Sequence, residues 1–372
     1  MESTTRSPRI LVVGCGGIGG IVAASLRELD LPVVGVTGNA KVADALRETG
    51  ARIRDDGGTR TIRGIEAHVD LPIDAGAFDF ILLATQPQDV ERTAAVVAPY
   101  LAADGRLVCL QNGLCEYRVA PLVGANRVLG AVVAWGGSQI EPGNYDRTSS
   151  GGFVLGRIDG QDDPRAHELA RLLECIGPTT VTQNLAGARW SKLAINCGIS
   201  ALGALGGDRL GVLMRSRRVR RLALELMTEV VLVARREGIP LEKVSGTLDL
   251  DWLALTEAER TMSGGPSLVA KHGLLLAVGT RFRRMRSSML AAIERGRPGA
   301  VDFLNGEIVE RADKLGLEVP VNLAAQRMIH AIGRREKTSS LALIYELYAK
   351  TGFVRGEALD PRESVAPPSR PA

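Results

Sequence analysis

Six residues near the start of the chain constrain its fold more than any other segment: Gly14-Cys15-Gly16-Gly17-Ile18-Gly19. They follow an apolar run at 9–13 that is typical of a buried parallel strand. They precede apolar residues at helical spacing over 18–29, and a second apolar run at 31–37 completes a strand–helix–strand unit. A GxGxxG spacing at this place in such a unit predicts a Rossmann fold whose six motif residues bind a dinucleotide.

Three glycines of this motif each have a physical reason. Gly14 permits the tight turn, Gly16 lets the backbone approach a pyrophosphate, and Gly19 lets the helix pack closely on the strand. The start of the helix offers free N–H groups and the positive end of its dipole to the phosphates. The alternative is a tight strand-to-helix turn that holds no ligand.

The end of the second strand indicates which dinucleotide is bound. A carboxylate at that place would hold the ribose hydroxyls of NAD, but the sequence continues from Thr37 to Lys41 without an acid. Thr37, Asn39 and Lys41 are all suited to contact a 2′-phosphate, which favours NADP(H). The alternative for Lys41 is a solvated position on the next helix. Gln86, after the strand expected at 79–84, is a further expected cofactor contact.

The rest of the first half alternates between apolar strands and helical segments. Buried strands are expected at 79–84, 106–110 and 128–134, with a helix over about 88–102. The stretch 138–156 contains short segments between Pro-Gly and Ser-Ser-Gly-Gly turns, which predicts an antiparallel meander at the sheet edge.

After about residue 185 the strand pattern stops and helical periodicity takes over. Helices are expected at 186–205, 218–237, 301–315 and, as one or two helices, 320–348. We therefore predict an α/β Rossmann domain followed by an all-α domain. The domain boundaries that we expect are a flexible start at 1–8, the Rossmann domain at 9–184, the helical catalytic domain at 185–350 and a disordered tail at 351–372.

Composition excludes several other classes of protein. The net charge of +4 and an aromatic content of 4% do not indicate a nucleic-acid-binding protein. The five cysteines and four histidines have no metal-ligand spacing, which predicts no metal site and suits a reducing compartment. No signal peptide and no apolar run of about 20 residues is present, so we expect a cytoplasmic protein without a membrane segment.

A narrow polar stripe marks the helix expected at 186–205. Lys192, Asn196 and Ser200 are spaced i, i+4, i+8 and share one face of an α-helix, while their neighbours are apolar or small. A solvated helix would carry a wider polar face, so the stripe predicts a largely buried helix whose polar residues line a cleft. The alternative is a lysine whose ammonium reaches the surface beside a bonded amide.

Five motifs in order along residues 9–345 resemble the ketopantoate (2-dehydropantoate 2-) reductase family. They are Gly14–Gly19, Gln111-Asn112-Gly113, Trp190-Ser191-Lys192-Leu193 with Asn196, Ser287-Ser288-Met289-Leu290, and Asp302 with Asn305-Gly306. The resemblance implies a Rossmann domain joined to a helical domain of the 6-phosphogluconate dehydrogenase type, with the active site in the cleft between them.

The same resemblance implies roles for individual residues. Lys192 would be the general acid that protonates the developing alkoxide, and Asn196 would orient the substrate or Lys192. Ser288 would bind the substrate carboxylate, and Asn112 would lie by the nicotinamide ribose. Asn112 is also expected to bind the substrate, and Ser200 and Asp302 complete the expected substrate-binding set. The residue types suit the chemistry, because an ammonium near a carbonyl stabilises the negative charge that hydride transfer places on its oxygen.

Three positions depart from the family pattern. Ser200 stands where the family has a second asparagine, and Ala300 stands where it has a glutamate. Gly38 stands where the family places a basic residue for the 2′-phosphate. The first two changes alter the pocket for ketopantoate, and the third leaves the 2′-phosphate to Asn39 or Lys41.

The function that we predict is NADPH-dependent reduction of a small anionic 2-oxo acid, ketopantoate or a related one, to the 2-hydroxy acid. One alternative is an imine or opine-type reductase on the same scaffold, since Ala300 and Ser200 change the pocket. Another is a redox sensor that binds NADP without turnover, although binding a dinucleotide does not require Lys192. A homodimer is expected only by analogy with the fold.

Overall fold

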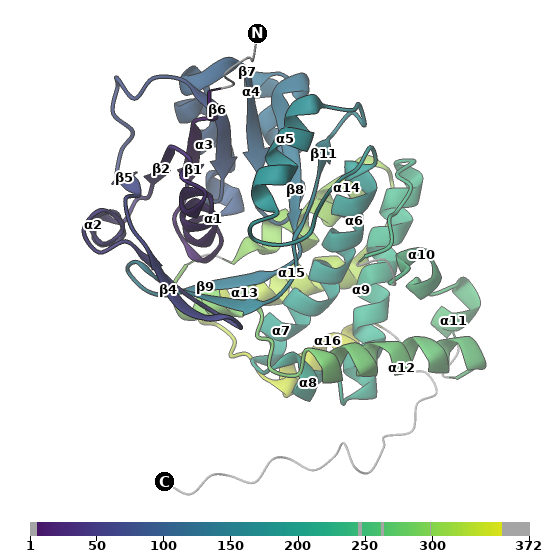
Figure 1. Ribbon diagram of the computed structural model, residues 1–372. Helices are drawn as coiled ribbons and strands as arrows, with labels where there is room; N and C mark the ends of the chain where they lie inside the picture. Colours follow the sequence, from purple (N-terminus) through teal and green to yellow (C-terminus); the bar gives the residue numbers. More distant parts are fainter. Residues whose placement is uncertain (1–5, 245–247, 262–263, 298, 352–372) are drawn as a thin grey trace, which may run out of the picture. The chain divides into compact units, whose positions relative to one another are not determined.

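A computed structural model describes residues 6–244, 248–261, 264–297 and 299–351. The chain divides into two compact units, Met1–Arg189 and Trp190–Ala372, which are described in turn (Figure 1). The expected tail lies outside the described residues except for Thr351, as do the first five residues of the expected flexible start.

The first unit is built on an eight-stranded sheet in the order β12-β11-β8-β7-β6-β1-β2-β5. All neighbouring pairs are parallel except β11 and β8. The order reverses between β1 and β6, which is the place where doubly wound sheets bind their ligands. The strands span β1 Ile10–Val13, β2 Val33–Val36, β5 Glu66–His68, β6 Phe78–Leu83, β7 Leu101–Cys109, β8 Val128–Val133, β11 Phe153–Arg157 and β12 Thr179–Val181.

Helices cover both faces of this sheet, which explains the continuous apolar runs of its central strands. Ile10 and Val12 of β1 share one core with α1 (Gly17–Glu28) and α5 (Pro164–Leu173). Leu11 and Val13 point the other way, into a core with α3 (Val90–Val97) and α4 (Cys115–Val123).

A second sheet of four strands, in the order β4-β3-β10-β9, also belongs to the first unit. It combines a hairpin of β3 (Ala51–Asp55) and β4 (Gly58–Ile62), after α2 (Ala40–Glu48), with a hairpin of β9 (Gly136–Glu141) and β10 (Asn144–Ser149). The antiparallel pairing predicted within 138–156 is confirmed for β9 and β10, but the meander at the edge of the main sheet is wrong. β10 pairs with β3, and only β11 joins the main sheet. The buried side chains of Ile53 and Tyr145 draw the second sheet onto the core beside α1.

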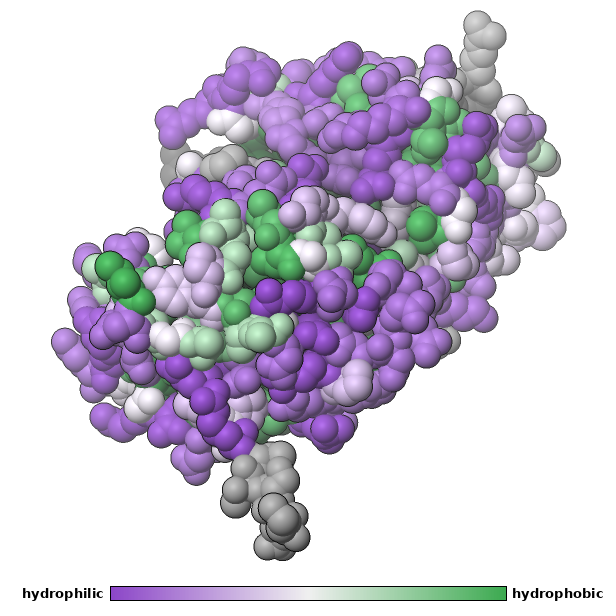
Figure 2. Space-filling model, turned by 90° about the horizontal axis from the view of Figure 1, so that it is seen from above, coloured by the Kyte–Doolittle hydropathy of each residue, from purple (hydrophilic) through white to green (hydrophobic). Residues whose placement is uncertain are grey.

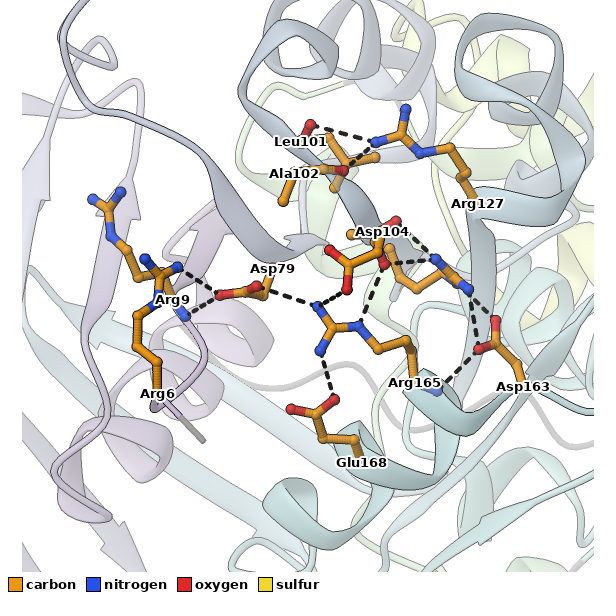
Figure 3. Close-up of polar contacts among 12 residues, drawn as sticks. Arg6, Arg9, Asp79, Leu101, Ala102, Asp104, Arg127, Asp163, Arg165 and Glu168 are labelled. Carbon is orange, nitrogen blue, oxygen red and sulfur yellow. Dashed lines mark hydrogen bonds and ion pairs between the residues drawn. The ribbon is translucent and has the colours of Figure 1, made fainter. Parts of the chain in front are cut away.

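Charged side chains join several elements at the edge of the main sheet where β1 and β6 begin (Figure 3). Asp79 of β6 accepts hydrogen bonds from the N–H of Arg9 at 2.8 Å and from the guanidinium of Arg165 at 3.2 Å. Asp163 pairs with Arg106 of β7 at 2.7 Å and also caps α5. This network lies at the opposite end of β1 from the glycine motif and has a structural role.

The second unit is helical. Its longest helix, α9 (Arg217–Arg236), begins at the capping side chain of Ser216 and is buried along most of its length. Helix α6 (Leu185–Ile195) begins in the first unit, and its residues from Trp190 onward belong to the second. The other described helices are α7 Ala201–Gly206, α8 Leu210–Leu213, α10 Leu250–Leu253, α11 Glu257–Thr261, α12 Pro266–Arg281, α13 Ser288–Glu294, α14 Asn305–Lys314, α15 Pro320–Gly333 and α16 Leu341–Lys350.

Two of the expected helices are interrupted. A π-helical turn at Asn196–Ser200 divides the helix expected at 186–205 into α6 and α7. The segment expected at 301–315 begins as a 3₁₀ turn at Ala300–Phe303 and continues as α14.

The surface in Figure 2 is mostly hydrophilic, with several apolar groups among the polar residues. Exposed apolar side chains include Ile140 and Val269. Within the described residues, no helix combines the length and the apolarity that crossing a lipid bilayer requires.

Candidate functional site

The glycine motif forms the turn from β1 into α1, and close approaches require glycine at Gly14 and Gly19. Gly14 has φ of 98°, and a Cβ there would lie 2.7 Å from the carbonyl carbon of Ala84. A Cβ on Gly19 would lie 2.0 Å from the Gly14 oxygen. Among the described residues, apart from Gly16 itself and its neighbours along the chain, no atom lies within 4 Å of where a Gly16 Cβ would be. The turn is therefore tight on its inner side and open at Gly16.

The start of α1 suits a phosphate group. Gly16 is the N-cap residue, no described side chain caps it, and the first turn carries no acidic residue. The backbone N–H groups of the first turn and the positive end of the helix dipole face the open side of the turn. The residues present therefore fit the pyrophosphate of a dinucleotide.

Cys15 contributes its backbone rather than its thiol to this turn. Its side chain is only 1% exposed, and burial raises the pKa of the thiol to about 12. A thiol with such a pKa stays protonated at neutral pH and does not react.

The residues after β2 are exposed, apart from Thr37. Thr37 is buried and donates its N–H to the His68 carbonyl at 2.9 Å. Asn39 caps α2, because its side-chain oxygen accepts from the Lys41 N–H at 3.1 Å. Gly38, Asn39 and Lys41 are exposed, and the first turn of α2 carries no acid. The amide oxygen of Asn39 is thus already engaged, which leaves its NH₂ group and Lys41 to face a ligand.

The loops after β6 and β7 are bonded to each other. Gln111 donates from its side-chain nitrogen to the Thr85 hydroxyl at 3.3 Å. Next to these two residues, Gln86 is exposed and Asn112 is half-buried. Both follow carboxyl ends of strands near the point where the sheet order reverses.

A buried ion pair holds the Gln-Asn-Gly loop, and sequence reasoning missed it. Arg189 of α6 pairs with Glu116 of α4 and donates to the carbonyls of Cys109 at 2.7 Å and Gln111 at 2.8 Å. Arg189 is 3% exposed and Glu116 is fully buried. Burial raises the pKa of the Glu116 carboxyl, although the Arg189 charge opposes this rise. The only sequence signal was a charge on an otherwise apolar helix, directly before the Trp-Ser-Lys motif.

The predicted polar stripe is partly buried. Lys192, Asn196 and Ser200 are all intermediate between buried and exposed. The amide nitrogen of Asn196 is buried and has no hydrogen-bond partner among the described residues. Because the π-helical turn begins at Asn196, the α-helical spacing that placed Ser200 on the same face does not hold beyond that residue.

Side chains from two other helices bond the carbonyls of the π-helical turn. Asn305, the first residue of α14, donates to the Cys197 oxygen at 3.2 Å. Ser287, before α13, donates to the Ser200 oxygen at 2.8 Å. A π-helical turn departs from the usual α-helical hydrogen-bond ladder, and these bonds satisfy its carbonyls. The turn is therefore part of a defined structure rather than a frayed helix.

Asn305 in turn belongs to a buried polar chain. It donates to the side-chain oxygen of Asn322 at 2.9 Å, and Asn322 donates to Glu229 at 2.7 Å. The N–H groups of Val321 and Asn322 also donate to the Glu229 carboxylate, at 2.9 and 2.8 Å. Burial raises the pKa of Glu229 to about 7, and these N–H groups oppose the rise.

The remaining predicted substrate residues differ in their surroundings. Ser288 is exposed at the first position of α13, while its neighbour Ser287 caps that helix. One carboxylate oxygen of Asp302 lies 2.7 Å from the side-chain nitrogen of Gln326 and 2.8 Å from Nε2 of His330. Asp302 is thus bonded to two residues of α15.

Comparisons with known proteins match both units. A family model described as ketopantoate reductase PanE/ApbA matches residues 10–160, and its C-terminal counterpart matches residues 184–333. A 2-dehydropantoate 2-reductase of Halobacterium salinarum is 28% identical over 84% of this chain and 95% of its own length.

Solved structures show the same fold. A PanE/ApbA family ketopantoate reductase from Ralstonia eutropha JMP134 has a TM-score of 0.73 and 24% identity, over 89% of this chain and 100% of that one. D-mandelate dehydrogenase, solved with NADH and anilino(oxo)acetate, also has a TM-score of 0.73, with 17% identity over 88% of this chain and 99% of that one.

Proposed function

This chain belongs to the ketopantoate reductase PanE/ApbA family, and from that premise we propose that it is an oxidoreductase that reduces a 2-oxo acid to the 2-hydroxy acid with NADPH. Its relative from Halobacterium salinarum is named for that reaction on 2-dehydropantoate. The observation that carries the proposal is a half-buried Lys192 four residues before Asn196, whose buried amide nitrogen has no partner among the described residues.

The first unit supplies the cofactor site in this proposal. The backbone from Gly14 to Gly19 holds the pyrophosphate, and Asn39 and Lys41 hold the 2′-phosphate. Gln86 and Asn112 contact the part of the cofactor that lies over the carboxyl ends of β6 and β7. The nicotinamide, when bound, supplies a hydride to the substrate carbonyl carbon.

Lys192 and Asn196 act on the carbonyl oxygen. Hydride addition leaves a negative charge on that oxygen, which the Lys192 ammonium stabilises and then protonates. Asn196 donates its free amide N–H to the substrate or orients the lysine, which satisfies a group that is otherwise buried without a bond.

Ser288, Ser200 and Asp302 complete the substrate side of the proposal. The exposed hydroxyl of Ser288, at the start of α13, suits a carboxylate. Ser200 and Ala300 stand where the family has an asparagine and a glutamate, so this chain lacks two groups that help to hold ketopantoate in the family. We therefore propose that the substrate class is wider than ketopantoate and includes other 2-oxo acids.

The test is NADPH oxidation by the purified full-length protein, followed by absorbance, with ketopantoate beside a panel of other 2-oxo acids. Turnover with any of them supports the reaction class, and the ranking of kcat/KM identifies the substrate. A cyclic imine in the same panel distinguishes the imine-reductase alternative. Silence with every carbonyl compound, in a protein that binds NADPH, would contradict the proposal and favour a redox sensor.

A further inference from the structure

A tyrosine of the second sheet reaches the glycine turn from behind. Tyr145 lies in β10, 130 residues from the turn, and is only 1% exposed. Its O–H donates to the carbonyl oxygen of Cys15 at 3.0 Å. Its ring lies so close to α1 that a Cβ on Gly20 would be 2.3 Å from ring carbons. Burial raises the pKa of the phenol above its usual value, so it remains a proton donor in this bond at neutral pH.

The position of this bond sets the direction of the next N–H group. The Cys15 carbonyl and the Gly16 N–H belong to one planar trans peptide, in which the two groups point in opposite directions. A carbonyl held inward by Tyr145 therefore aims the Gly16 N–H outward. Gly16 is also the motif residue that has open space around it. The bond thus fixes a donor on the side where a pyrophosphate fits.

Strand β9 supports the same turn one residue further along. A Cβ on Gly17 would lie 2.4 Å from the Gly137 oxygen, and a Cβ on Gly137 would lie 2.6 Å from the Gly17 oxygen. The two backbones are thus in direct contact. Since β9 and β10 form one hairpin, the glycine turn is backed by the second sheet as well as by the main one.

We propose that Tyr145 is a positioning residue for pyrophosphate binding, which it promotes by holding the Cys15–Gly16 peptide in the orientation that presents the Gly16 N–H. This inference rests on the proposed function, because it requires that the turn binds a dinucleotide. In this proposal the second sheet contributes to cofactor affinity through Tyr145, in addition to the glycine motif itself.

The test compares Tyr145→Phe with the wild type in the full-length protein. Phe keeps the ring against Gly20 and removes only the hydroxyl. Two ligands are titrated: NADPH, followed by its fluorescence, and 2′-AMP, which carries the 2′-phosphate but no pyrophosphate, followed by calorimetry. We expect the Kd for NADPH to rise roughly 3- to 10-fold, because the dinucleotide must then order a peptide that the hydrogen bond holds in the free protein. The Kd for 2′-AMP should stay within about twofold, because one uncharged bond away from its site is all that changes.

Tyr345→Phe is the matched control, since the Tyr345 hydroxyl contacts Ser216 in the other unit. It should leave both Kd values unchanged. Gly137→Ala is a second variant, in which the added Cβ pushes β9 against Gly17. It should also raise the Kd for NADPH and leave the Kd for 2′-AMP nearly unchanged.

Each other outcome overturns the proposal in a recognisable way. An unchanged Kd for NADPH in Tyr145→Phe, beside a wild type that binds NADPH, overturns the positioning role alone. Equal weakening of both ligands means that the substitution loosens the whole unit, which also overturns it. A wild type that binds neither ligand overturns the proposed function together with this inference.

Discussion

At the scale of single residues, Lys192 carries most of the chemistry that we propose. Replacing it with Ala should lower kcat by roughly 10²- to 10⁴-fold, the range expected for a lost general acid. The Kd for NADPH should change by less than about twofold, because a group that acts on the substrate oxygen adds little to cofactor binding. Steady-state kinetics and fluorescence titration measure the two quantities. The matched control is Lys314→Ala, which removes an exposed lysine side chain. Near-normal turnover in Lys192→Ala would show that Lys192 is not the general acid.

Cofactor choice is also decided by single side chains. Gly38 is exposed, has no described atom within 4 Å of its Cβ position and has no positive φ, so a larger residue fits there without strain. Gly38→Arg should raise the ratio of kcat/KM for NADPH over NADH about tenfold, because a guanidinium bonded to the 2′-phosphate forms charge-assisted hydrogen bonds. Gly38→Ala controls for the loss of glycine. A ratio that is unchanged in Gly38→Arg would indicate that the 2′-phosphate does not lie after β2.

At the scale of elements, the Arg189–Glu116 pair joins α6 to α4 and to the end of β7. Arg189→Met should lower the free energy of unfolding by about 3–5 kcal/mol, because it leaves a buried carboxylate uncompensated. The double variant Arg189→Met with Glu116→Gln should recover part of that loss. Urea unfolding of the wild type, both single variants and the double variant measures the coupling. Additive losses would show that the pair is not energetically coupled.

The elements that the sequence predicted correctly are those with a local signal. The central strands are continuous apolar runs because both faces are buried, and the GxGxxG turn is fixed by contacts among near neighbours such as Gly14 and Gly19. The second sheet had no such signal, since β3 pairs with a strand about 90 residues away and carries charges on its exposed face. The π-helical turn was missed because the segment 186–205 contains no proline and keeps a helical pattern throughout.

Separation along the sequence also distinguishes the predicted site residues from the contacts that were missed. Lys192 and Asn196 could be predicted as site residues because they are four residues apart in one helical segment. Arg189 and Glu116 are 73 residues apart, and Tyr145 is 130 residues from Cys15, so only the tertiary structure brings each pair together. In sequence, a lone Glu or Tyr on a predicted element looks like any solvated or core residue.

At the scale of the whole molecule, each unit has its own core and its own buried charge, so the two can respond differently to pH. In the helical unit the carboxyl of Glu229 has its pKa raised by burial to about 7, above the usual 4.5 of an unfolded chain. A folded-state pKa above the unfolded value adds stability that is complete below about pH 4.5 and is lost as pH rises to about 7. We therefore expect ionisation of Glu229 to weaken the helical unit as pH approaches neutrality.

Glu229→Gln isolates this effect, because glutamine does not ionise. The variant should be less stable than the wild type at pH 5, since its NH₂ group faces the donors of Val321 and Asn322. The difference in Tm between the two proteins should narrow as pH is raised from 5 to 7, because only the wild type bears the cost of a buried charge. Thermal unfolding at several pH values, with Glu310→Gln on the surface as the matched control, measures this trend. A difference that is constant or that widens with pH would show that the bonds from Val321 and Asn322 keep Glu229 ionised throughout, with a folded-state pKa at or below that of the unfolded chain.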